Sequence, residues 1–376
     1  MPDTAHLTAP AIECAATDFS PSLLLLQWHI TERCNLQCTH CYQAKNPMCE
    51  LDWASLMRIW DQFRELRAQV MDRRAGKPTR FHVSVTGGEP FVRADAMQLL
   101  ETIAAEPTLC SLAVLCNGLF IDDTLACRLA KLRLSYVQVS IDGSEATHDQ
   151  IRGEGAHARA VSGIRHLTRH GVPVMLSFTA TRENYSEFAD VARLGASLGV
   201  RRVWADRCIP LGRGASGESP GPEETQQLLQ SMHRESTSIH AKRGTTEIAM
   251  HRALQFLEAG GLPYRCTAGS GLVTVLANGD VCPCRRMPIV VGNVIETPLS
   301  DIYWGNDTFQ RLRDNDVIPE GCERCFYSRT CRGGLRCLSY ATYGTPFVGD
   351  PGCWLRDVTP DRVPAQDKMA VSAGRE

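Results

Sequence analysis

The sequence predicts an α/β fold followed by a cysteine-rich C-terminal part. Strand-like segments alternate six times with segments that have apolar residues at helical spacing, which is typical of a parallel sheet with crossover helices. The 17 cysteines are unevenly distributed, with three between Cys34 and Cys41 and eight between Cys266 and Cys353. We therefore expect an α/β barrel or a doubly wound sheet, with a second unit built around thiols.

The predicted strands are short apolar runs. The first, residues 23–30, is almost continuously apolar, as expected of a strand that is buried on both faces. The six predicted strands span residues 23–30, 81–86, 112–116, 136–141, 172–179 and 200–205.

The predicted helices lie between these strands. In residues 51–66, Leu56, Ile59 and Phe63 fall on one helical face. The predicted helices span residues 51–66, 94–104, 123–132, 159–169, 185–198 and 223–257.

Composition and charge exclude several classes of protein. The chain has 376 residues, of which 43% are hydrophobic and 22% charged, as in ordinary globular proteins. Its net charge of -2 supplies no excess of Lys and Arg to neutralise nucleic-acid phosphates. The N-terminus lacks the basic and apolar regions of a secretory signal, and no apolar run reaches the roughly 20 residues of a membrane span. We therefore predict a cytoplasmic protein without nucleic-acid or membrane binding, in which clustered thiols are ligands or catalysts rather than disulfides.

The first cysteine group follows the first predicted strand, at the sheet edge where active sites of parallel α/β folds form. Cys34, Cys38 and Cys41 lie within eight residues and could bind one iron-sulfur cube. A cube needs four ligands, so three thiolates leave one iron open to a ligand that is not protein. The alternatives are a zinc knuckle completed by His40 or three thiols of the core, although zinc sites usually pair cysteines across a two-residue gap.

These residues resemble the radical S-adenosylmethionine (radical SAM) superfamily. The spacing Cys34-X3-Cys38-X2-Cys41 is followed by Gly-Gly-Glu-Pro at residues 87–90, at the end of the second predicted strand. Further agreement comes after the third and fourth strands, with Asn117-Gly118 and the Ser-Ile-Asp-Gly segment at residues 140–143.

The resemblance implies a partial (β/α)6 TIM-like barrel over residues 21–210. It also implies a 4Fe-4S cluster that reductively cleaves S-adenosylmethionine (SAM) to a 5'-deoxyadenosyl radical, which abstracts hydrogen from a substrate. Glu89 would accept from the SAM ammonium, His40 would lie beside the adenine, and Ser140 and Arg152 would contact the carboxylate or ribose. The alternatives are a plain tight turn at the two glycines and a solvated helix start at Arg152. The residues implied in SAM binding are His40, Gly87, Gly88, Glu89, Asn117, Ser140 and Arg152.

The second cysteine group is similar to the SPASM extension of radical SAM enzymes, whose seven-cysteine pattern holds two auxiliary 4Fe-4S clusters. The resemblance implies a SPASM domain over residues 263–357 and three 4Fe-4S clusters in all. A zinc ribbon is the alternative. The implied ligands of auxiliary cluster II are Cys322, Cys325, Cys331 and Cys353.

Auxiliary cluster I is where this sequence departs from the family pattern. The usual cysteine four residues after Cys331 is Leu335, and Cys337 must bulge back to serve in its place. Cys282 could complete the set or could pack beside a ligand. The predicted ligands of auxiliary cluster I are Cys266, Cys282, Cys284 and Cys337.

A second departure concerns the base. Sulfatase-maturing members have an aspartate directly after the cysteine that corresponds to Cys284, and this chain has Arg285. A guanidinium cannot accept a proton at working pH, so sulfatase maturation is disfavoured and no catalytic residue is assigned beyond the cluster. The arginines beside the cysteines would tune a cluster, hold an acidic substrate or form ordinary ion pairs. They are Arg285, Arg286, Arg332 and Arg336.

The remaining segments are expected to connect or to extend these units. Residues 1–20 are predicted to be a flexible extension, residues 211–262 a linker loop and helix, and residues 358–376 a flexible tail. The early position of Cys34 leaves no room for a fused leader-binding domain, so we expect a separate leader-recognition protein or direct reading of the leader.

The leading functional hypothesis is oxidation or crosslinking of a peptide or protein side chain. An external low-potential donor such as flavodoxin or ferredoxin would supply electrons. The alternatives are the same chemistry on a small molecule, such as a tetrapyrrole or carbohydrate, and a non-catalytic electron-transfer protein. Residues 204–207, Trp-Ala-Asp-Arg, are predicted to contact the substrate, with a plain ion pair as the alternative.

Overall fold

The structure is a computed structural model that describes residues 19–43, 49–242 and 244–355. The predicted extension over 1–20, apart from Phe19 and Ser20, and the predicted tail over 358–376 lie outside the described residues. Among the described helices, none is long and apolar enough to cross a membrane.

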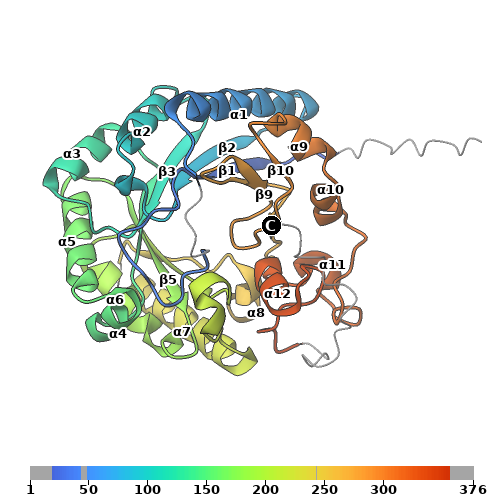
Figure 1. Ribbon diagram of the computed structural model, residues 1–376. Coiled ribbons are helices and arrows are strands. Elements are labelled where there is room, and N and C mark those ends of the chain that lie inside the picture. The colour runs from blue at the N-terminus through green and yellow to red at the C-terminus, as the bar shows by residue number, and fades with distance from the viewer. Residues whose placement is uncertain (1–18, 44–48, 243, 356–376) are drawn as a thin grey trace, which may run out of the picture.

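One ten-stranded sheet curves into an open barrel (Figure 1), in the order β10-β9-β8-β1-β2-β3-β4-β5-β6-β7. The first six strands pair in parallel with their sequence neighbours, which confirms the predicted α/β fold class. Each predicted strand forms within two residues of its expected bounds. These strands are β1 Leu23–His29, β2 Arg80–Thr86, β3 Ser111–Cys116, β4 Tyr136–Ser140, β5 Val174–Ala180 and β6 Arg202–Arg207.

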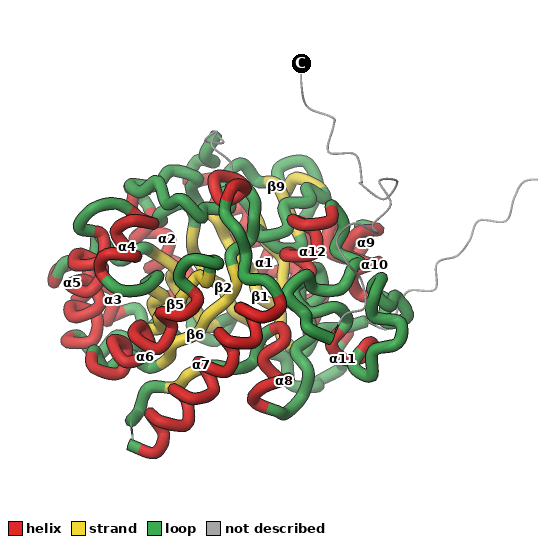
Figure 2. Tube along the Cα trace, turned by 90° about the horizontal axis from the view of Figure 1, so that it is seen from below, coloured by secondary structure: helices red, strands yellow, loops and turns green. Residues whose placement is uncertain are grey.

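Helices cover the outside of the sheet (Figures 1 and 2). In α1, Leu56, Ile59 and Phe63 are at most 1% exposed, as their spacing predicts. The Asp52 side chain caps this helix by accepting from the Ser55 amide at 2.9 Å. The helices of the barrel are α1 Trp53–Arg73, α2 Ala96–Ala104, α3 Asp123–Lys131, α4 Glu145–Arg152, α5 Ala156–Arg169, α6 Phe188–Ser197 and α7 Pro222–Ala241, with the 3-10 helices η1 Pro90–Val92 and η2 Tyr185–Glu187.

Two helical predictions were wrong. Helix α4 was not predicted, because it is short and mostly polar and begins at the cap of Ser144. The predicted helix over 223–257 ends instead at Ala241, where the amide of Gly244 turns back onto the Ile239 carbonyl. The chain then forms β7 Glu247–Ile248 parallel to β6, followed by η4 Ala253–Gln255 and α8 Phe256–Ala259. Long-range pairing with β6 overrides the local helical pattern here.

The predicted linker begins with a packed segment. Residues Gly212–Ser216 form the 3-10 helix η3, and the Gly214 amide donates to the carbonyl of Cys41 at 3.0 Å. A Cβ on Gly212 would lie 2.2 Å from the Gln43 carbonyl oxygen, so no larger residue fits there. This segment therefore supports the cysteine loop from the end of β6.

The C-terminal part extends the barrel sheet. Strand β8 Leu272–Val275 pairs in parallel with β1, and β9 Asp280–Cys282 and β10 Gly292–Asn293 continue the sheet in antiparallel pairing. The second cysteine group is thereby joined to the strand that leads into the first. The helices of this part are α9 Leu299–Gly305, α10 Asp307–Arg313, α11 Ser328–Cys331 and α12 Arg336–Tyr343.

A buried ion pair fastens the C-terminal part to the barrel. Arg207 at the end of β6 donates to both carboxylate oxygens of Asp350, at 2.7 and 2.5 Å. The two side chains are 4% and 1% exposed. Asp350 also accepts from the amides of Leu335 and Gly352, each at 2.9 Å. One carboxylate thus holds the end of β6 and two turns of the cysteine-rich region together.

Replacing Asp350 with Asn should strongly destabilise the protein, because the Arg207 guanidinium would stay buried without its counter-charge. We expect the free energy of unfolding to fall by about 3–5 kcal/mol, measured by chemical denaturation of the anaerobic holoprotein. The control is Asp190→Asn, which removes an exposed partner of Arg193 at 3.4 Å and should change stability by less than about 1 kcal/mol. Equal effects of the two changes would contradict this role of the buried pair.

Candidate metal and cofactor site

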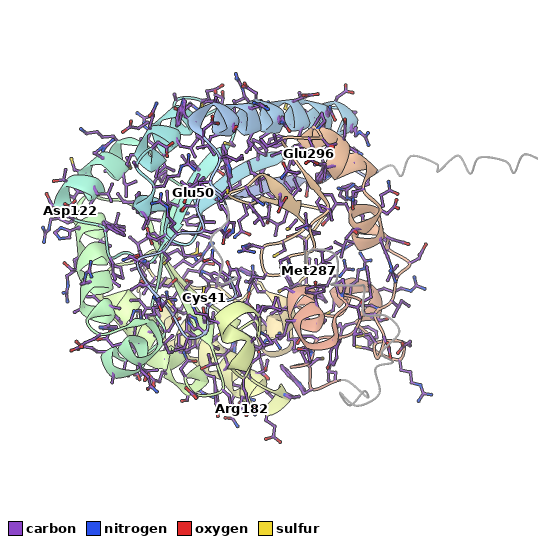
Figure 3. The ribbon with its side chains drawn as sticks, viewed as in Figure 1. Cys41, Glu50, Asp122, Arg182, Met287 and Glu296 are labelled. Carbon is purple, nitrogen blue, oxygen red and sulfur yellow. The ribbon has the colours of Figure 1, made fainter. Side chains whose placement is uncertain are left out.

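A cavity of about 540 Å³ occupies the interior of the barrel. Both cysteine groups reach it. Figure 3 places Cys41 inside the ring of helices, whereas Asp122 and Arg182 lie at its edge. The thiol-bearing residues that line the cavity include Cys34, Cys38 and Cys41 from the first group and Cys266, Cys284 and Cys337 from the second.

The first cysteine loop is held by a close backbone contact with the glycine pair. The Gly88 amide donates to the Thr31 carbonyl at 2.8 Å, and the Glu89 amide donates to the Arg33 carbonyl at 2.9 Å. A Cβ on Gly87 would lie 2.4 Å from the Thr31 oxygen, and one on Gly88 would lie 2.3 Å from the Arg33 oxygen. Both glycines are therefore required by the cysteine loop itself, a reason that the sequence did not suggest.

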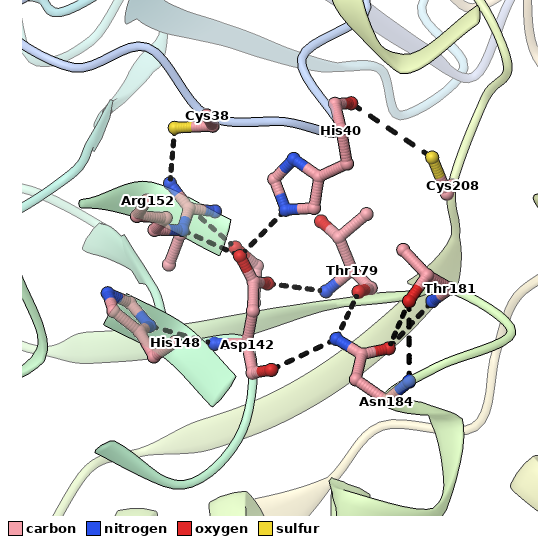
Figure 4. A network of polar contacts seen from close by, with 11 residues as sticks. Cys38, His40, Asp142, His148, Arg152, Thr179, Thr181, Asn184 and Cys208 are labelled. Atoms are coloured by element: carbon pink, nitrogen blue, oxygen red, sulfur yellow. Dashed lines mark hydrogen bonds and ion pairs between the residues drawn. The ribbon is translucent and has the colours of Figure 1, made fainter. Parts of the chain in front are cut away.

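Asp142 is the centre of a buried polar network behind that loop (Figure 4). Its Oδ2 accepts from His40 Nε2 at 2.8 Å and from Arg152 Nε at 2.6 Å. Its Oδ1 accepts from the Thr179 amide at 2.9 Å, and its carbonyl accepts from Asn184 Nδ2 at 2.9 Å. Asp142 thus orients both His40 and Arg152. Sequence reasoning assigned it no role, although a carboxylate directly after a parallel strand was an available signal.

The thiols of the first cysteine group need positive charge nearby in order to ionise. Burial raises the pKa of Cys34 to about 11 and also raises the pKa of Cys38, although Arg152 partly offsets the latter shift. Arg152 Nη1 lies 3.8 Å from Cys38 Sγ. Burial would also raise the pKa of Asp142, but Arg152 and His40 lower it by more, so this carboxylate stays ionised. Thiolates at these positions need a cationic partner such as a metal centre, which fits a cluster site.

The predicted SAM residues divide into two groups. The Glu89 carboxylate is fully buried and is not among the residues that line the cavity. It accepts from the Asn117 amide at 2.7 Å and from the Phe91 amide at 3.3 Å. Burial raises the pKa of Glu89 to about 7. Ser140 faces the cavity with its hydroxyl 3.2 Å from that of Ser177. The six predicted SAM residues that line the cavity are His40, Gly87, Gly88, Asn117, Ser140 and Arg152.

The predicted auxiliary I thiols also separate. Cys266, Cys284 and Cys337 line the cavity, but the described lining does not include Cys282. Cys282 is fully buried in β9. Burial raises the pKa of its thiol, and the nearby charge of Asp280 adds to that shift. The structure therefore brings three of the four predicted thiols to the cavity and leaves Cys282 packed beside them.

A glycine-rich bulge explains how Cys337 reaches the cavity. Arg332, Gly333 and Gly334 have consecutive positive φ angles of 56°, 86° and 68°. A Cβ on Gly334 would lie 2.6 Å from the Asp350 carboxylate, so glycine is required there. The turn places Cys337 in the first turn of α12 and accommodates the two extra residues of its spacing.

The auxiliary II thiols line a second pocket. Cys322, Cys325, Cys331 and Cys353 surround it together with apolar side chains. All cysteines within the described ranges are free thiols. Among those same residues, no three His, Cys, Asp or Glu side chains are close enough to share a single metal ion. Four thiols around one pocket match the four thiolate ligands of a 4Fe-4S cluster.

All four arginines beside the cysteines have polar partners. Arg285 Nη2 pairs with Glu32 Oε2 at 2.8 Å, and both side chains are at most 5% exposed. Arg332 donates to the Asp314 carbonyl, and Arg336 donates to the Leu312 carbonyl at 2.8 Å. The ordinary ion-pair and hydrogen-bond alternative thus accounts for these three residues.

The remaining arginine, Arg286, faces the cavity. Its Nη1 lies 2.7 Å from Asp206 Oδ2, which Arg252 Nη2 also contacts at 2.8 Å. Trp204, Asp206 and Arg207 line the cavity, and Asp206 and Arg207 both form ion pairs, which is the alternative to the predicted substrate contact. Sequence reasoning missed Arg252, which fell within a wrongly predicted helix and gave no local signal.

Two known family profiles match the chain, one over the first cysteine group and one over the second group as far as Cys325. The sequence profile of the radical SAM superfamily matches residues 28–195. The profile of the SPASM iron-sulfur cluster-binding domain matches residues 266–326.

Individual relatives differ in what they act on. The chain is 27% identical to the AdoMet-dependent heme synthase of Oleidesulfovibrio alaskensis, over 97% of this chain and 95% of that protein. It is 30% identical to the mycofactocin maturase MftC of Mycobacterium ulcerans, over 88% of this chain and 87% of that protein. Its fold resembles that of Streptococcus suis SuiB bound to S-adenosylmethionine, with a TM-score of 0.70 and 18% identity over 90% of this chain and 78% of SuiB.

Replacing Gly88 with Ala should displace the first cysteine loop, because the added Cβ meets the Arg33 backbone. We expect the iron content to fall from about twelve to about eight per chain, as one of three four-iron clusters is lost. Anaerobic iron and sulfide analysis with electron paramagnetic resonance would measure this. Gly305→Ala is the matched control, because nothing lies within 4 Å of its Cβ. Full iron content in the Gly88 variant would contradict the argument.

Replacing Cys337 should perturb auxiliary cluster I, whereas replacing Cys282 should not, because only Cys337 faces the cavity. We expect Cys337→Ala to lose the paramagnetic signal or about four irons of that cluster, and Cys282→Ala to keep about twelve. The reverse result would identify Cys282 as the ligand.

Proposed function

Because the chain belongs to the radical SAM superfamily and has its SPASM iron-sulfur domain, we propose that it abstracts hydrogen from a peptide side chain. The product would be an oxidised or crosslinked residue. The observation that carries this proposal is the single cavity reached by both cysteine groups. A substrate in that cavity would lie beside the thiols proposed to hold the radical-forming cluster and beside those proposed to hold an auxiliary cluster.

The described residues fit the cofactors that the family uses. We propose that Cys34, Cys38 and Cys41 hold the first 4Fe-4S cluster and that the cavity-facing SAM residues hold S-adenosylmethionine beside it. When bound, this pair supplies the radical that removes the hydrogen atom. Asp142 keeps His40 and Arg152 in place through bonds of 2.8 and 2.6 Å. Cys266, Cys284 and Cys337 are proposed for auxiliary cluster I, and Cys322, Cys325, Cys331 and Cys353 for auxiliary cluster II.

The residues of β1 that line the cavity support an extended substrate. Alternate residues of β1, namely Leu23, Leu25 and Gln27, line it in succession, so the cavity follows the strand. Successive inward positions on a strand are about 6.6 Å apart, which matches the side-chain repeat of an extended peptide. The highest sequence identity quoted above, 30%, is also to a maturase.

The carboxylate of Asp206, which lies in the cavity with the auxiliary thiols, is a poor candidate for a base. Burial would raise the pKa of Asp206, but Arg252 and Arg286 lower it by more, so its carboxylate is a weak proton acceptor. We therefore propose no catalytic residue beyond the cluster sites.

A tetrapyrrole substrate is the second candidate. It is favoured by the heme synthase relative, which aligns over 97% of this chain.

The free thiols of the described chain and the need for low-potential electrons are consistent with a cytoplasmic setting and an external carrier.

The two candidates predict different products. Reduced enzyme incubated with SAM and a short peptide encoded beside its gene should yield 5'-deoxyadenosine and a changed peptide mass, measured by liquid chromatography and mass spectrometry. The control is the variant with Cys34, Cys38 and Cys41 all replaced by Ala, which should yield neither product. Deoxyadenosine formation that responds to an added porphyrin and not to peptides would favour the tetrapyrrole.

A further inference from the structure

Arg252 is held from several sides in the central cavity. Its Nε and Nη2 donate to Asp206 Oδ2 at 3.0 and 2.8 Å. The guanidinium also lies over two aromatic rings, with Cζ 5.0 Å from the ring centre of Trp204 and 5.6 Å from that of Tyr264. Trp204 is itself fixed, because its Nε1 donates to Gln138 Oε1 at 3.2 Å. The position of this cation is therefore set before any ligand binds.

Part of the Arg252 guanidinium remains open to the cavity. Arg252, Asp206, Trp204 and Tyr264 all line the cavity, and the Arg252 side chain is 30% exposed. Within the described part of the chain, Arg252 Nη1 forms no hydrogen bond, since the bonds of this side chain come from Nε and Nη2. A guanidinium donates up to five hydrogen bonds in a fixed planar arrangement, so Nη1 can serve a further acceptor. A carboxylate is the acceptor that suits this planar donor best.

The cavity wall contains more cations than anions. Among the described residues that line it, six are arginines and one, Asp206, has a carboxylate. Three of these arginines pair with carboxylates outside the lining, namely Arg152 with Asp142, Arg202 with Glu247 and Arg207 with Asp350. Arg252 and Arg286 instead share the single carboxylate of Asp206. An anionic group on a ligand would complement this pair of cations.

We propose that Arg252 binds a carboxylate group of the substrate, with Asp206 and the two aromatic rings holding the guanidinium in position. This rests on the proposed function, because it names the group by which the substrate is held during hydrogen abstraction. Arg286, which shares Asp206, lies near the thiols of Cys284 and Cys337. The carboxylate is therefore anchored on the auxiliary I side of the cavity, and Arg252 selects substrates that carry an acidic group.

The proposal is tested by measuring binding without turnover. Unreduced anaerobic holoprotein with SAM, in which no radical forms, is titrated by calorimetry with two probe peptides, acetyl-Ala-Glu-Ala-amide and acetyl-Ala-Gln-Ala-amide. The probes differ in one carboxylate. Wild type should bind the acidic peptide about tenfold more tightly or better, because a charge-assisted hydrogen bond is lost in the amide. Arg252→Gln should bind the two peptides equally.

A second pair of probes separates the sources of the carboxylate. Coproporphyrin, which carries four propionates, is compared with its tetra-amide in the same titration. A carboxylate preference in the peptide pair assigns the Arg252 site to an acidic peptide side chain. A preference confined to the porphyrin pair assigns the same site to a tetrapyrrole propionate.

Matched variants show whether the effect belongs to Arg252. Arg252→Gln leaves Asp206 paired with Arg286 at 2.7 Å, so this variant should fold and keep its iron content. Arg252→Lys keeps the charge without the planar donor and should restore only part of the preference. Arg202→Gln is the control, because Arg202 also lines the cavity and begins the same strand, β6, but pairs with Glu247 at 2.6 Å. It should leave the preference unchanged.

Three results would overturn the proposal. The first is the absence of a carboxylate preference in both probe pairs, as expected if the auxiliary thiolates already balance the charge of Arg286. The second is an unchanged preference in Arg252→Gln. The third is an equal loss in Arg202→Gln, which would assign the effect to the general charge of the cavity.

Binding and product formation are separate measurements. A modified peptide without any carboxylate preference would remove the Arg252 site and leave the proposed function standing. A carboxylate preference lost in Arg252→Gln, without product in the peptide assay, would do the reverse.

Discussion

The close backbone contact between the first cysteine loop and Gly87-Gly88 is the constraint on which the site depends. The amide-carbonyl bonds of 2.8 and 2.9 Å require the two chains to approach until no Cβ fits between them. The loop is then held on its other side by η3, where Gly214 donates to Cys41 at 3.0 Å. Three strand ends, those of β1, β2 and β6, therefore position one set of thiols. A contact made of backbone is insensitive to side-chain rotamers, which suits a site that must hold several sulfur atoms in a defined arrangement.

Arginine-carboxylate pairs join the cysteine-rich part to the barrel. Arg285 pairs with Glu32, Arg286 with Asp206, and Arg207 with Asp350. In each pair one partner lies on the barrel and the other in the C-terminal part. Buried charges of this kind cost desolvation energy and contribute geometry more than stability. Here they set how the auxiliary thiols face the first cysteine loop.

The thiol groups differ in their distance from solvent. The first group and the cavity-facing auxiliary thiols share the barrel interior, whereas the auxiliary II thiols line a separate pocket near an exposed aromatic side chain. The two groups of auxiliary thiols therefore lie in different surroundings. Cys322, Cys325 and Cys331, in and before α11, line the separate pocket, whereas Cys337 in α12 returns to the central cavity.

Local sequence patterns were sufficient for the strands, the cysteine spacings and the family resemblance, because periodicity and short-range spacing directly encode them. The orientation of Glu89, the burial of Cys282 and the role of Arg252 were decided by tertiary structure. Each depends on a partner that is remote in the sequence. Glu89 accepts from the Asn117 amide, Cys282 lies in a strand that pairs with β8, and Arg252 pairs with Asp206. Remote contacts also hold the segment that was predicted to begin the linker. Gly212 and Gly214 pack against the backbone of the cysteine loop, and Arg213 Nε donates to the Cys38 carbonyl at 3.2 Å across 175 residues. The sequence by itself thus determined which chemistry is present, and only the packing of remote segments decided which side chains face it.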